Sequence, residues 1–187
     1  MIGILIGGGI AATGFVVGTY VVGTYNMLTT ARQDIRTMFS DIITEYQRRA
    51  DLFLNLAASA KGAMKFEKST LTELTKARAG KLGETDKDKI KKMGDLEKTF
   101  SKLLAVVEAY PDIKSIGTVQ QLMEEIRLTE DRINVSRTDY NNVVRDYNVA
   151  VTTFPSRMVA RQFGFNQEIY FQAVSKNVEI SPKIDIE

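Results

Sequence analysis

The pattern of apolar and polar positions divides the chain at Arg32. The first 31 residues contain no Asp, Glu, Lys or Arg. A helix of about 20 apolar residues is long enough to cross the hydrocarbon core of a bilayer. The Ile, Leu, Val and Phe side chains between Ile2 and Val22 favour insertion by roughly 3–6 kcal/mol before the glycines are counted. This stretch is therefore predicted to contain a single transmembrane anchor at residues 1–25.

Two other interpretations of the apolar stretch are less favoured. A signal peptide would begin with a positively charged segment and end at a small-x-small cleavage site before a change of composition, and neither is present. A buried helix of a soluble protein would lose about 0.8–1.0 kcal/mol per Gly relative to Ala. Membrane helices accept Gly more readily, so the glycine content also favours an anchor.

The small residues of the anchor are concentrated on one helical face. At 100° per residue, five of them fall within about 80° of arc, and they are Gly3, Gly7, Ala11, Gly14 and Gly18. Two pairs have the GxxxG spacing that lets helix backbones approach closely in lipid. This face is predicted to drive self-association into a homo-oligomer, although Gly is also common in membrane helices that do not associate.

Helical periodicity continues after Arg32, and breaker residues become rare. The first helix is expected to run from the anchor to about Ala60, with Arg49 among the positions of its apolar stripe, which are Ile35, Phe39, Ile42, Tyr46, Phe53 and Leu56. A second helix is expected at about 66–79. A third is expected to start at the Thr85-x-x-Asp88 cap and to end near Ala109 before Pro111.

The fourth helix has the longest apolar seam, which keeps a three-four alternation typical of helix bundles and coiled coils. Its positions are Val119, Leu122, Ile126, Thr129, Ile133, Ser136, Tyr140, Val143, Tyr147, Ala150 and Phe154. Thr118 and Gln121 have capping-box spacing, and Pro155 is expected to end the helix. The predicted fold is all-α: the anchor continues into an antiparallel four-helix bundle at 26–155 with long first and last helices. Residues 156–187 are expected to form a short amphipathic segment and an extended tail.

The composition excludes several classes of function. The 187 residues include 25 Lys and Arg against 23 Asp and Glu, and they include no Cys and no His. The near balance of charge and the lack of a basic stripe with interleaved aromatics argue against nucleic-acid binding. Without His and Cys, the usual general base, thiol nucleophile and zinc ligands are missing. No catalytic, cofactor-binding or metal-binding residue is proposed, and the protein is not expected to be an enzyme.

The charges beside the anchor predict its orientation. Arg32, Arg36, Arg48 and Arg49 follow the anchor, and no Lys or Arg precedes it. Because Lys and Arg mark the cytoplasmic side, we expect a single-pass protein of the bacterial inner membrane. Its N-terminus would lie outside, and its helical bundle would lie in the cytoplasm.

A membrane-interface surface is predicted from the aromatic and basic residues at both ends of the bundle. Four helices that leave the membrane must return to it, so the segment 154–171 is expected near the bilayer. The predicted interface residues are Tyr25, Arg32, Arg157, Arg161, Phe163 and Phe165. Aromatic and Arg side chains of this kind are typical of interfacial segments. The alternative is that the aromatics cover the base of the bundle against Ile35 and Phe39.

Charged clusters within the bundle are interpreted as structural. Arg48 and Arg49 could bind phosphate, but pairing with carboxylates is favoured for Arg48, Arg49 and Asp51 because buried Arg usually has such a partner. The candidate partners are Asp51 itself, Glu45, Asp139 and Asp146. The carboxylates Glu124, Glu125, Glu130 and Asp131 could bind a cation, but with Arg127 and Arg132 beside them a solvated helix face is favoured.

An ordered set of short motifs covers the chain from residue 23 onward. They are Gly23-Thr24-Tyr25-Asn26, Arg48-Arg49-Ala50-Asp51-Leu52, Asn55-Leu56, Lys61-Gly62, Ala77-Arg78-Ala79, Glu108-Ala109-Tyr110-Pro111-Asp112, Glu124-Glu125, Arg132-Ile133, Tyr140-Asn141, Tyr147-Asn148, Phe154-Pro155 and Phe163-Gly164-Phe165. In this order the chain resembles the LemA family of bacterial membrane-anchored helical proteins. The resemblance implies one N-terminal membrane helix and a cytoplasmic bundle. Leu54 stands where the family usually has Pro, which should make the first helix straighter here.

Two functions are compatible with these features. The first is a structural scaffold that self-assembles through its Gly-rich helix and organises or shapes the cytoplasmic membrane, with membrane lipid and copies of itself as partners. The alternative is an adaptor or regulator that presents its bundle to another membrane protein such as a protease or sensor. A large homomeric particle in mild detergent would favour the scaffold, whereas a monomer that captures a partner would favour the adaptor.

Overall fold

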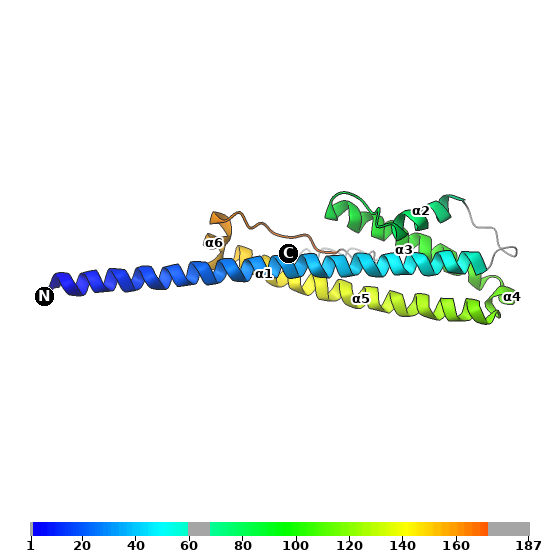
Figure 1. The fold of residues 1–187 in the computed structure, drawn as a ribbon, viewed down its shortest axis with the longest axis horizontal. Helices are drawn as coiled ribbons and strands as arrows, with labels where there is room; N and C mark the ends of the chain where they lie inside the picture. The colour runs from blue at the N-terminus through cyan, green and yellow to red at the C-terminus, as the bar shows by residue number, and fades with distance from the viewer. Residues whose placement is uncertain (1, 60–67, 172–187) are drawn as a thin grey trace, which may run out of the picture. The chain divides into compact units, whose positions relative to one another are not determined.

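The computed structural model describes residues 2–59 and 68–171, with side chains described from Gly14 onward. Within these residues the backbone forms helices, turns and irregular segments but no strand, so the fold is all-α (Figure 1). The helices are α1 Ile2–Ser59, α2 Lys68–Arg78, α3 Asp86–Glu108, α4 Pro111–Lys114, α5 Gly117–Thr152 and α6 Ser156–Gln162.

The predicted first helix corresponds to α1, which is drawn as one uninterrupted blue-to-cyan helix in Figure 1. Its predicted stripe is buried throughout, because Ile35, Phe39, Ile42, Tyr46, Arg49, Phe53 and Leu56 are each at most 6% exposed. The 4-3-4 spacing of this stripe keeps its side chains on one side of the helix. The hydrophobic pattern therefore identified the buried face of α1 correctly.

The predicted third helix is confirmed as α3, including its first turn. The Thr85 hydroxyl accepts a hydrogen bond from the Asp88 N–H, and the Asp88 carboxylate accepts one from the Thr85 N–H. This reciprocal capping box satisfies two amide groups that a helix leaves without intrahelical partners. The hydrogen bonds from Thr85 hold the pKa of the Asp88 carboxyl below its usual range.

Two predictions about α5 are wrong. The helix begins at Gly117, so Thr118 is its second residue and cannot be the residue that precedes and caps it. The seam is confirmed at Tyr140 and Tyr147, but Val144 and Val151 are buried in place of the predicted Val143 and Ala150. A straight helix with 3.6 residues per turn drifts by about 20° per heptad from a strict three-four pattern, which accounts for these two changes. Phe154 lies beyond the end of the helix at Thr152 and is 81% exposed.

The chain divides into two compact units, and one contains residues 1–49 and 124–170. In this first unit α1 and α5 pack antiparallel. Arg49 pairs with Glu130, and the ring of Phe39 lies 5.6 Å from that of Tyr140, so the contact positions rise along α1 as they fall along α5. Such pairing lets each helix bury its apolar stripe against the other.

The second unit contains residues 50–123 and 171–187. Phe53 stacks on Phe100 of α3 with ring centroids 4.6 Å apart. Arg78 at the end of α2 pairs with Asp51, with 2.7 Å between nitrogen and oxygen. The side chains of Leu74, Met93 and Val107 complete a small apolar core. A single four-helix bundle is therefore not confirmed, because the chain forms two units and two short additional helices, α4 and α6.

The predicted membrane anchor corresponds to the N-terminal part of α1. Among the residues that the structure describes, no helix combines the length and apolar character needed to span a membrane. The transmembrane anchor at residues 1–25 is therefore not confirmed. The side chains of residues 1–13, which include Gly3, Gly7 and Ala11, lie outside the description.

Candidate functional site

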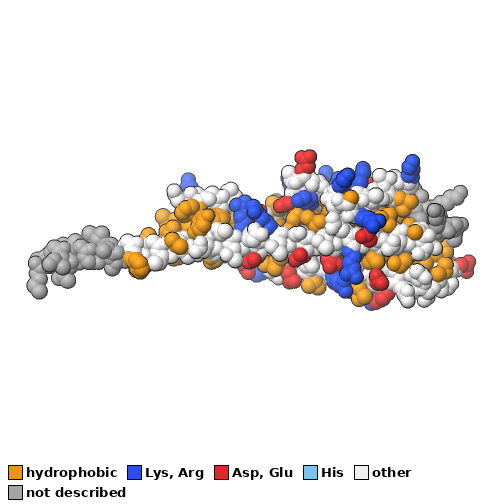
Figure 2. Space-filling model, in the orientation of Figure 1, with side chains coloured by type: hydrophobic (Ala, Val, Ile, Leu, Met, Phe, Trp, Pro, Cys, Tyr) orange, Lys and Arg blue, Asp and Glu red, His pale blue; other side chains and the backbone are white. Residues whose placement is uncertain are grey.

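The stretch of α1 from Gly14 to Gly23 is exposed at every position except Val21, which is half-buried. Its apolar side chains include Phe15, which is 73% exposed, and Val22, which is 60% exposed. In Figure 2 the part of α1 nearest to the grey residues shows orange and white atoms with no blue or red. A continuous apolar helix surface of this kind usually marks an interaction with protein or membrane.

The predicted oligomerisation residues Gly14 and Gly18 lie on this exposed stretch. A Cβ atom built on either glycine would have no heavy atom within 4 Å. A shallow groove runs along this side of α1 and is lined by Gly14, Phe15, Gly18, Thr19, Val22 and Gly23. Nothing in the described structure covers the groove, so a second helix could approach the backbone there.

The segment after α6 folds back onto α1 because of a helix cap at Gly164. Gly164 has a φ of +71°, and the N–H of Phe165 donates to the carbonyl oxygen of Ala160. This is the arrangement of a Schellman motif, which requires the left-handed conformation that Gly adopts most readily. The cap places the rings of Phe163 and Phe165 edge-on to Tyr25, with centroids 5.0 and 5.7 Å away. Three of the predicted interface residues are thus brought together.

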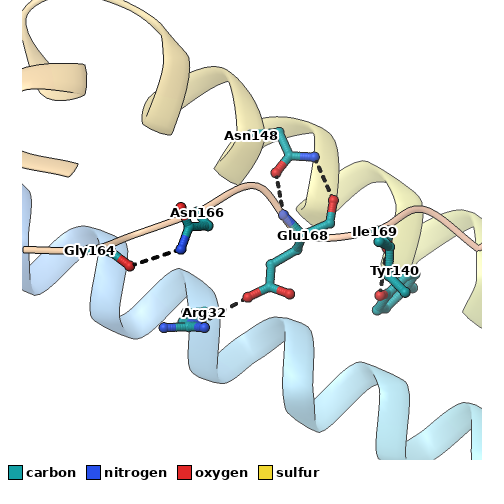
Figure 3. Close-up of polar contacts among 7 residues, drawn as sticks. All are labelled: Arg32, Tyr140, Asn148, Gly164, Asn166, Glu168 and Ile169. Atoms are coloured by element: carbon teal, nitrogen blue, oxygen red, sulfur yellow. Dashed lines mark hydrogen bonds and ion pairs between the residues drawn. The ribbon is translucent and has the colours of Figure 1, made fainter. Parts of the chain in front are cut away.

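Residues 166–170 are held in place by the side-chain amide of Asn148, which hydrogen-bonds to both backbone groups of one residue, as a neighbouring β-strand would. The Asn148 side chain donates to the carbonyl oxygen of Glu168 and accepts from its N–H, at 2.9 and 2.8 Å (Figure 3). The Glu168 carboxylate reaches Arg32 Nε at 3.0 Å, and the Tyr140 hydroxyl donates to the carbonyl oxygen of Ile169 at 2.8 Å. We call residues 163–170 the C-terminal strap.

Sequence reasoning missed the roles of Asn148 and Glu168. The sequence interpretation includes Asn148 as part of the Tyr147-Asn148 motif and gives no role to Glu168. A useful signal was available, because Asn148 lies beside Tyr147 of the buried stripe and a buried Asn needs hydrogen-bond partners. The sequence could not supply the partner, since Glu168 lies 20 residues away in an irregular segment.

The predicted interface arginines of α6 have different surroundings from Arg32. Arg157 and Arg161 are exposed, as are the neighbouring side chains of Phe154 and Met158. Phe171, in contrast, is only 2% exposed. The two predicted roles of segment 154–171, packing and membrane contact, therefore apply to different residues. Phe171 is packed, whereas Phe154 and Met158 remain available to a membrane or a partner.

The predicted ion-pair residues separate into three environments. Arg49 is 2% exposed, and its guanidinium lies 3.2 Å from the Glu130 carboxylate. Asp51 pairs with Arg78, and Arg48 is exposed. The prediction of a solvated face does not hold for Glu130, which lies beside the buried seam position Thr129 and so can reach across to α1. Glu124 does behave as expected and pairs with Arg127 one turn away.

A second cation lies between α1 and α5 in the first unit. Arg137 donates to the Tyr46 hydroxyl, and its guanidinium carbon lies 5.4 Å from the centre of the Tyr46 ring. Desolvation lowers the pKa of Arg137 to about 10, so this side chain is still charged at neutral pH. Burial raises the pKa of the Tyr147 hydroxyl, and that hydroxyl makes no hydrogen bond within the described structure.

The described residues contain no group of three or more acidic side chains arranged to hold a metal ion. The polar groups at the centre of the first unit are arginines, carboxylates and a tyrosine that pair with each other, which favours a structural role for them. The notable exposed features are the apolar stretch of α1 and the aromatic contact of Tyr25 with the C-terminal strap.

Comparisons with known proteins place the chain in a family. The LemA family model matches residues 38–186. The chain is 29% identical over 175 residues to magnetosome protein MamQ 1 of Paramagnetospirillum magneticum, covering 79% of this chain and 64% of that relative. Protein LemA of Metamycoplasma hominis is 28% identical over 155 residues, covering 81% of this chain and 70% of the relative.

Magnetosome protein MamQ of Magnetospirillum gryphiswaldense is 28% identical over 174 residues. The chain spans 64% of the length of the MamQ proteins that it matches. None of these names denotes an enzyme. Since the family model covers most of the chain, the protein belongs to the LemA family.

Proposed function

We propose that the protein is a structural scaffold of the bacterial cytoplasmic membrane that self-assembles through the glycine face of α1. The observation that carries this proposal is the exposed, charge-free stretch of α1 between Gly14 and Gly23. Water is a poor solvent for such a surface, and no side chain of the stretch is buried within the described structure. Lipid around the stretch would remove that cost.

The orientation in the membrane follows from the charges next to the apolar stretch. Arg32 and Arg36 begin the charged part of the chain, so the side with the two helical units would be cytoplasmic and the N-terminal end outside. Relatives named for the magnetosome, a cellular structure, support a structural role rather than a catalytic one.

Self-assembly would use the open groove at Gly14 and Gly18. In lipid, helix association depends on close packing because the hydrophobic effect does not favour one apolar neighbour over another. Small residues permit that packing, and both glycines have free space around them. An adaptor role remains the alternative, in which the protein stays monomeric and the helical units bind another membrane protein.

The test compares substitutions on opposite sides of the same helix. Gly14→Leu together with Gly18→Leu should reduce the mass of the purified full-length particle in mild detergent while the protein stays in the membrane fraction. Val16→Leu together with Tyr20→Leu is the matched control, because both side chains are exposed, lie outside the groove and are about 120–160° around the axis from the two glycines. Its particle should keep the wild-type mass.

Three results would contradict the proposal. A double variant whose particle keeps its mass would move assembly to another surface, and a monomeric wild-type protein that co-purifies with a membrane protein would favour the adaptor. The third result concerns orientation. Protease added to right-side-out cells should leave residues 32–187 intact, and cleavage of that region from outside would reverse the topology.

A further inference from the structure

An open groove lies beside the beginning of the charged part of α1. Its volume is about 540 Å³, and it is lined by Tyr25, Thr29, Thr30, Arg32, Gln33, Asp34, Arg36, Phe163 and Phe165. We call it the Tyr25–Arg36 groove. One wall comes from α1 and the other from the two Phe rings that the Gly164 cap holds against Tyr25.

The groove is apolar at one end and cationic at the other. At 100° per residue, Tyr25, Arg32 and Arg36 lie within about 40° of one another around α1. Helical side chains lean toward the N-terminus, so both guanidinium groups extend back toward the aromatic end. The hydroxyl of Thr29 and the amide of Gln33 lie between the two ends.

One of the two arginines of the groove has no carboxylate partner among the described residues. Arg32 pairs with Glu168, yet its side chain remains 38% exposed. Arg36 is exposed, and it takes part in no ion pair within the part of the chain that the structure describes. Asp34 also lines the groove, but it lies about 160° around the helix axis from Arg36 and therefore at the margin. A free guanidinium beside aromatic rings fits an anion that also carries apolar groups.

We propose that the Tyr25–Arg36 groove binds the phosphate headgroup of an anionic phospholipid. Arg36 would contact the phosphate oxygens in the two-point geometry that guanidinium groups favour. The acyl chains would then extend past Tyr25 toward the exposed apolar stretch at 14–23, where side chains such as Val22 face outward. This site rests on the proposed membrane insertion of α1.

A lipid suits the groove better than a free anion does. Inorganic phosphate would use the arginine end alone and would leave Tyr25, Phe163 and Phe165 facing water. Rings at the level of the headgroups are also typical of membrane interfaces, since they combine an apolar body with a polar edge. The apolar and cationic ends are used together only by an amphiphile.

The experiment measures lipid retained by the purified full-length protein in neutral detergent, using native mass spectrometry. Dioleoyl phosphatidylglycerol is compared with dioleoyl phosphatidylcholine, which has the same acyl chains but no net charge. The wild-type protein should retain phosphatidylglycerol preferentially. Arg36→Gln should weaken retention at least about tenfold, as expected for loss of a charge-assisted contact. Arg48→Gln is the matched control, because Arg48 is exposed on the same helix outside the groove.

Each other outcome overturns part of the proposal. Equal retention of the two lipids, or equal loss in the Arg48→Gln control, would show that no specific headgroup site exists. Displacement of the lipid by millimolar inorganic phosphate would identify a site for free phosphate instead. If lipid retention fails while the Gly14→Leu/Gly18→Leu variant still reduces particle mass, the proposed scaffold function stands without this site.

Discussion

Two stretches of α1 differ in how far their apolar side chains are buried. In α1, residues 14–23 contain no buried side chain, whereas Leu28, Ile42 and Tyr46 further along the helix are fully buried. In the first stretch apolar side chains point in all directions around the helix axis, whereas in the second stretch they are confined to one stripe. The two stretches therefore differ in the periodicity of their apolar positions. An apolar stripe packs against a protein partner, here α5, whereas the apolar surface around residues 14–23 has no such partner within the described structure.

The two stretches also differ in their charged side chains. The first stretch excludes charge completely, whereas the second places Arg49 in the middle of its buried stripe. Arg49 is accommodated because Glu130 on α5 faces it at 3.2 Å. A carboxylate partner offsets part of the cost of removing a cation from water, so a charge does not by itself mark the exposed side of a helix.

The sharpest way to test this comparison is to remove one Phe from each stretch. Phe39→Ala should lower the free energy of unfolding by about 3–5 kcal/mol, because it leaves a cavity beside Tyr140. Phe15→Ala should change it by less than about 0.5 kcal/mol, because Phe15 is already exposed. Urea denaturation of the full-length protein in mild detergent, followed by circular dichroism, measures both. Similar losses in the two variants would show that Phe15 is packed as Phe39 is.

The second prediction concerns the buried arginine. Arg49→Met keeps the apolar stem but removes the pairing with Glu130, and we expect a loss of about 2 kcal/mol in unfolding free energy. Breaking a buried pair usually costs more, but the Glu130 side chain is 46% exposed and can be rehydrated. Arg48→Met is the matched control and should cost less than about 0.5 kcal/mol. An unchanged stability in Arg49→Met would mean that this pair contributes nothing to the first unit.

The smallest effect is expected at the Tyr147 hydroxyl, which is buried without a hydrogen bond. Tyr147→Phe removes this polar group and should change stability by between zero and a gain of about 1 kcal/mol at pH 8. Burial is the main cause of the raised pKa of Tyr147, while Arg32 opposes the rise and Glu168 adds to it.

The pH dependence of this variant has a definite sign. Above pH 10, the usual pKa of Tyr, unfolded chains release the proton while folded chains still hold it. The free energy of unfolding therefore falls with rising pH until the raised pKa is passed. Tyr147→Phe should reduce this fall, as measured by denaturation at pH 8 and pH 10.5. A fall as steep as that of the wild type would show that Tyr147 does not contribute.

Local rules predicted much of the helical structure. The stripe from Ile35 to Leu56, including Arg49, and the Thr85–Asp88 capping box were both evident from spacing alone. These features depend on residues within a few turns of each other, and the helical period determines which of them share a face. The resemblance to the LemA family was also evident from ordered short motifs, and the family model bears it out.

Features that depend on long-range contact were not predicted. The buried positions Val144 and Val151 replace the predicted Val143 and Ala150 because the α5 stripe drifts gradually, which a strict three-four pattern ignores. The position of the C-terminal strap depends on hydrogen bonds between Asn148 and Glu168, and the partner of Arg49 lies 81 residues away. No periodic pattern in an irregular segment specifies such pairs. The predicted anchor and its glycine face remain predictions.

Because α1 is unbroken, the angle around its axis between the glycine face and the buried stripe is fixed. At 100° per residue, Gly14 and Gly18 point about 70° away from the direction in which Ile35, Phe39 and Ile42 are buried. Because no Pro or break intervenes between them, one extra residue inserted at 26–31 would rotate the glycine face by about 100° while the stripe stayed against α5. The number of residues between the two faces, and not only their identity, thus sets the direction in which a neighbouring copy could be bound.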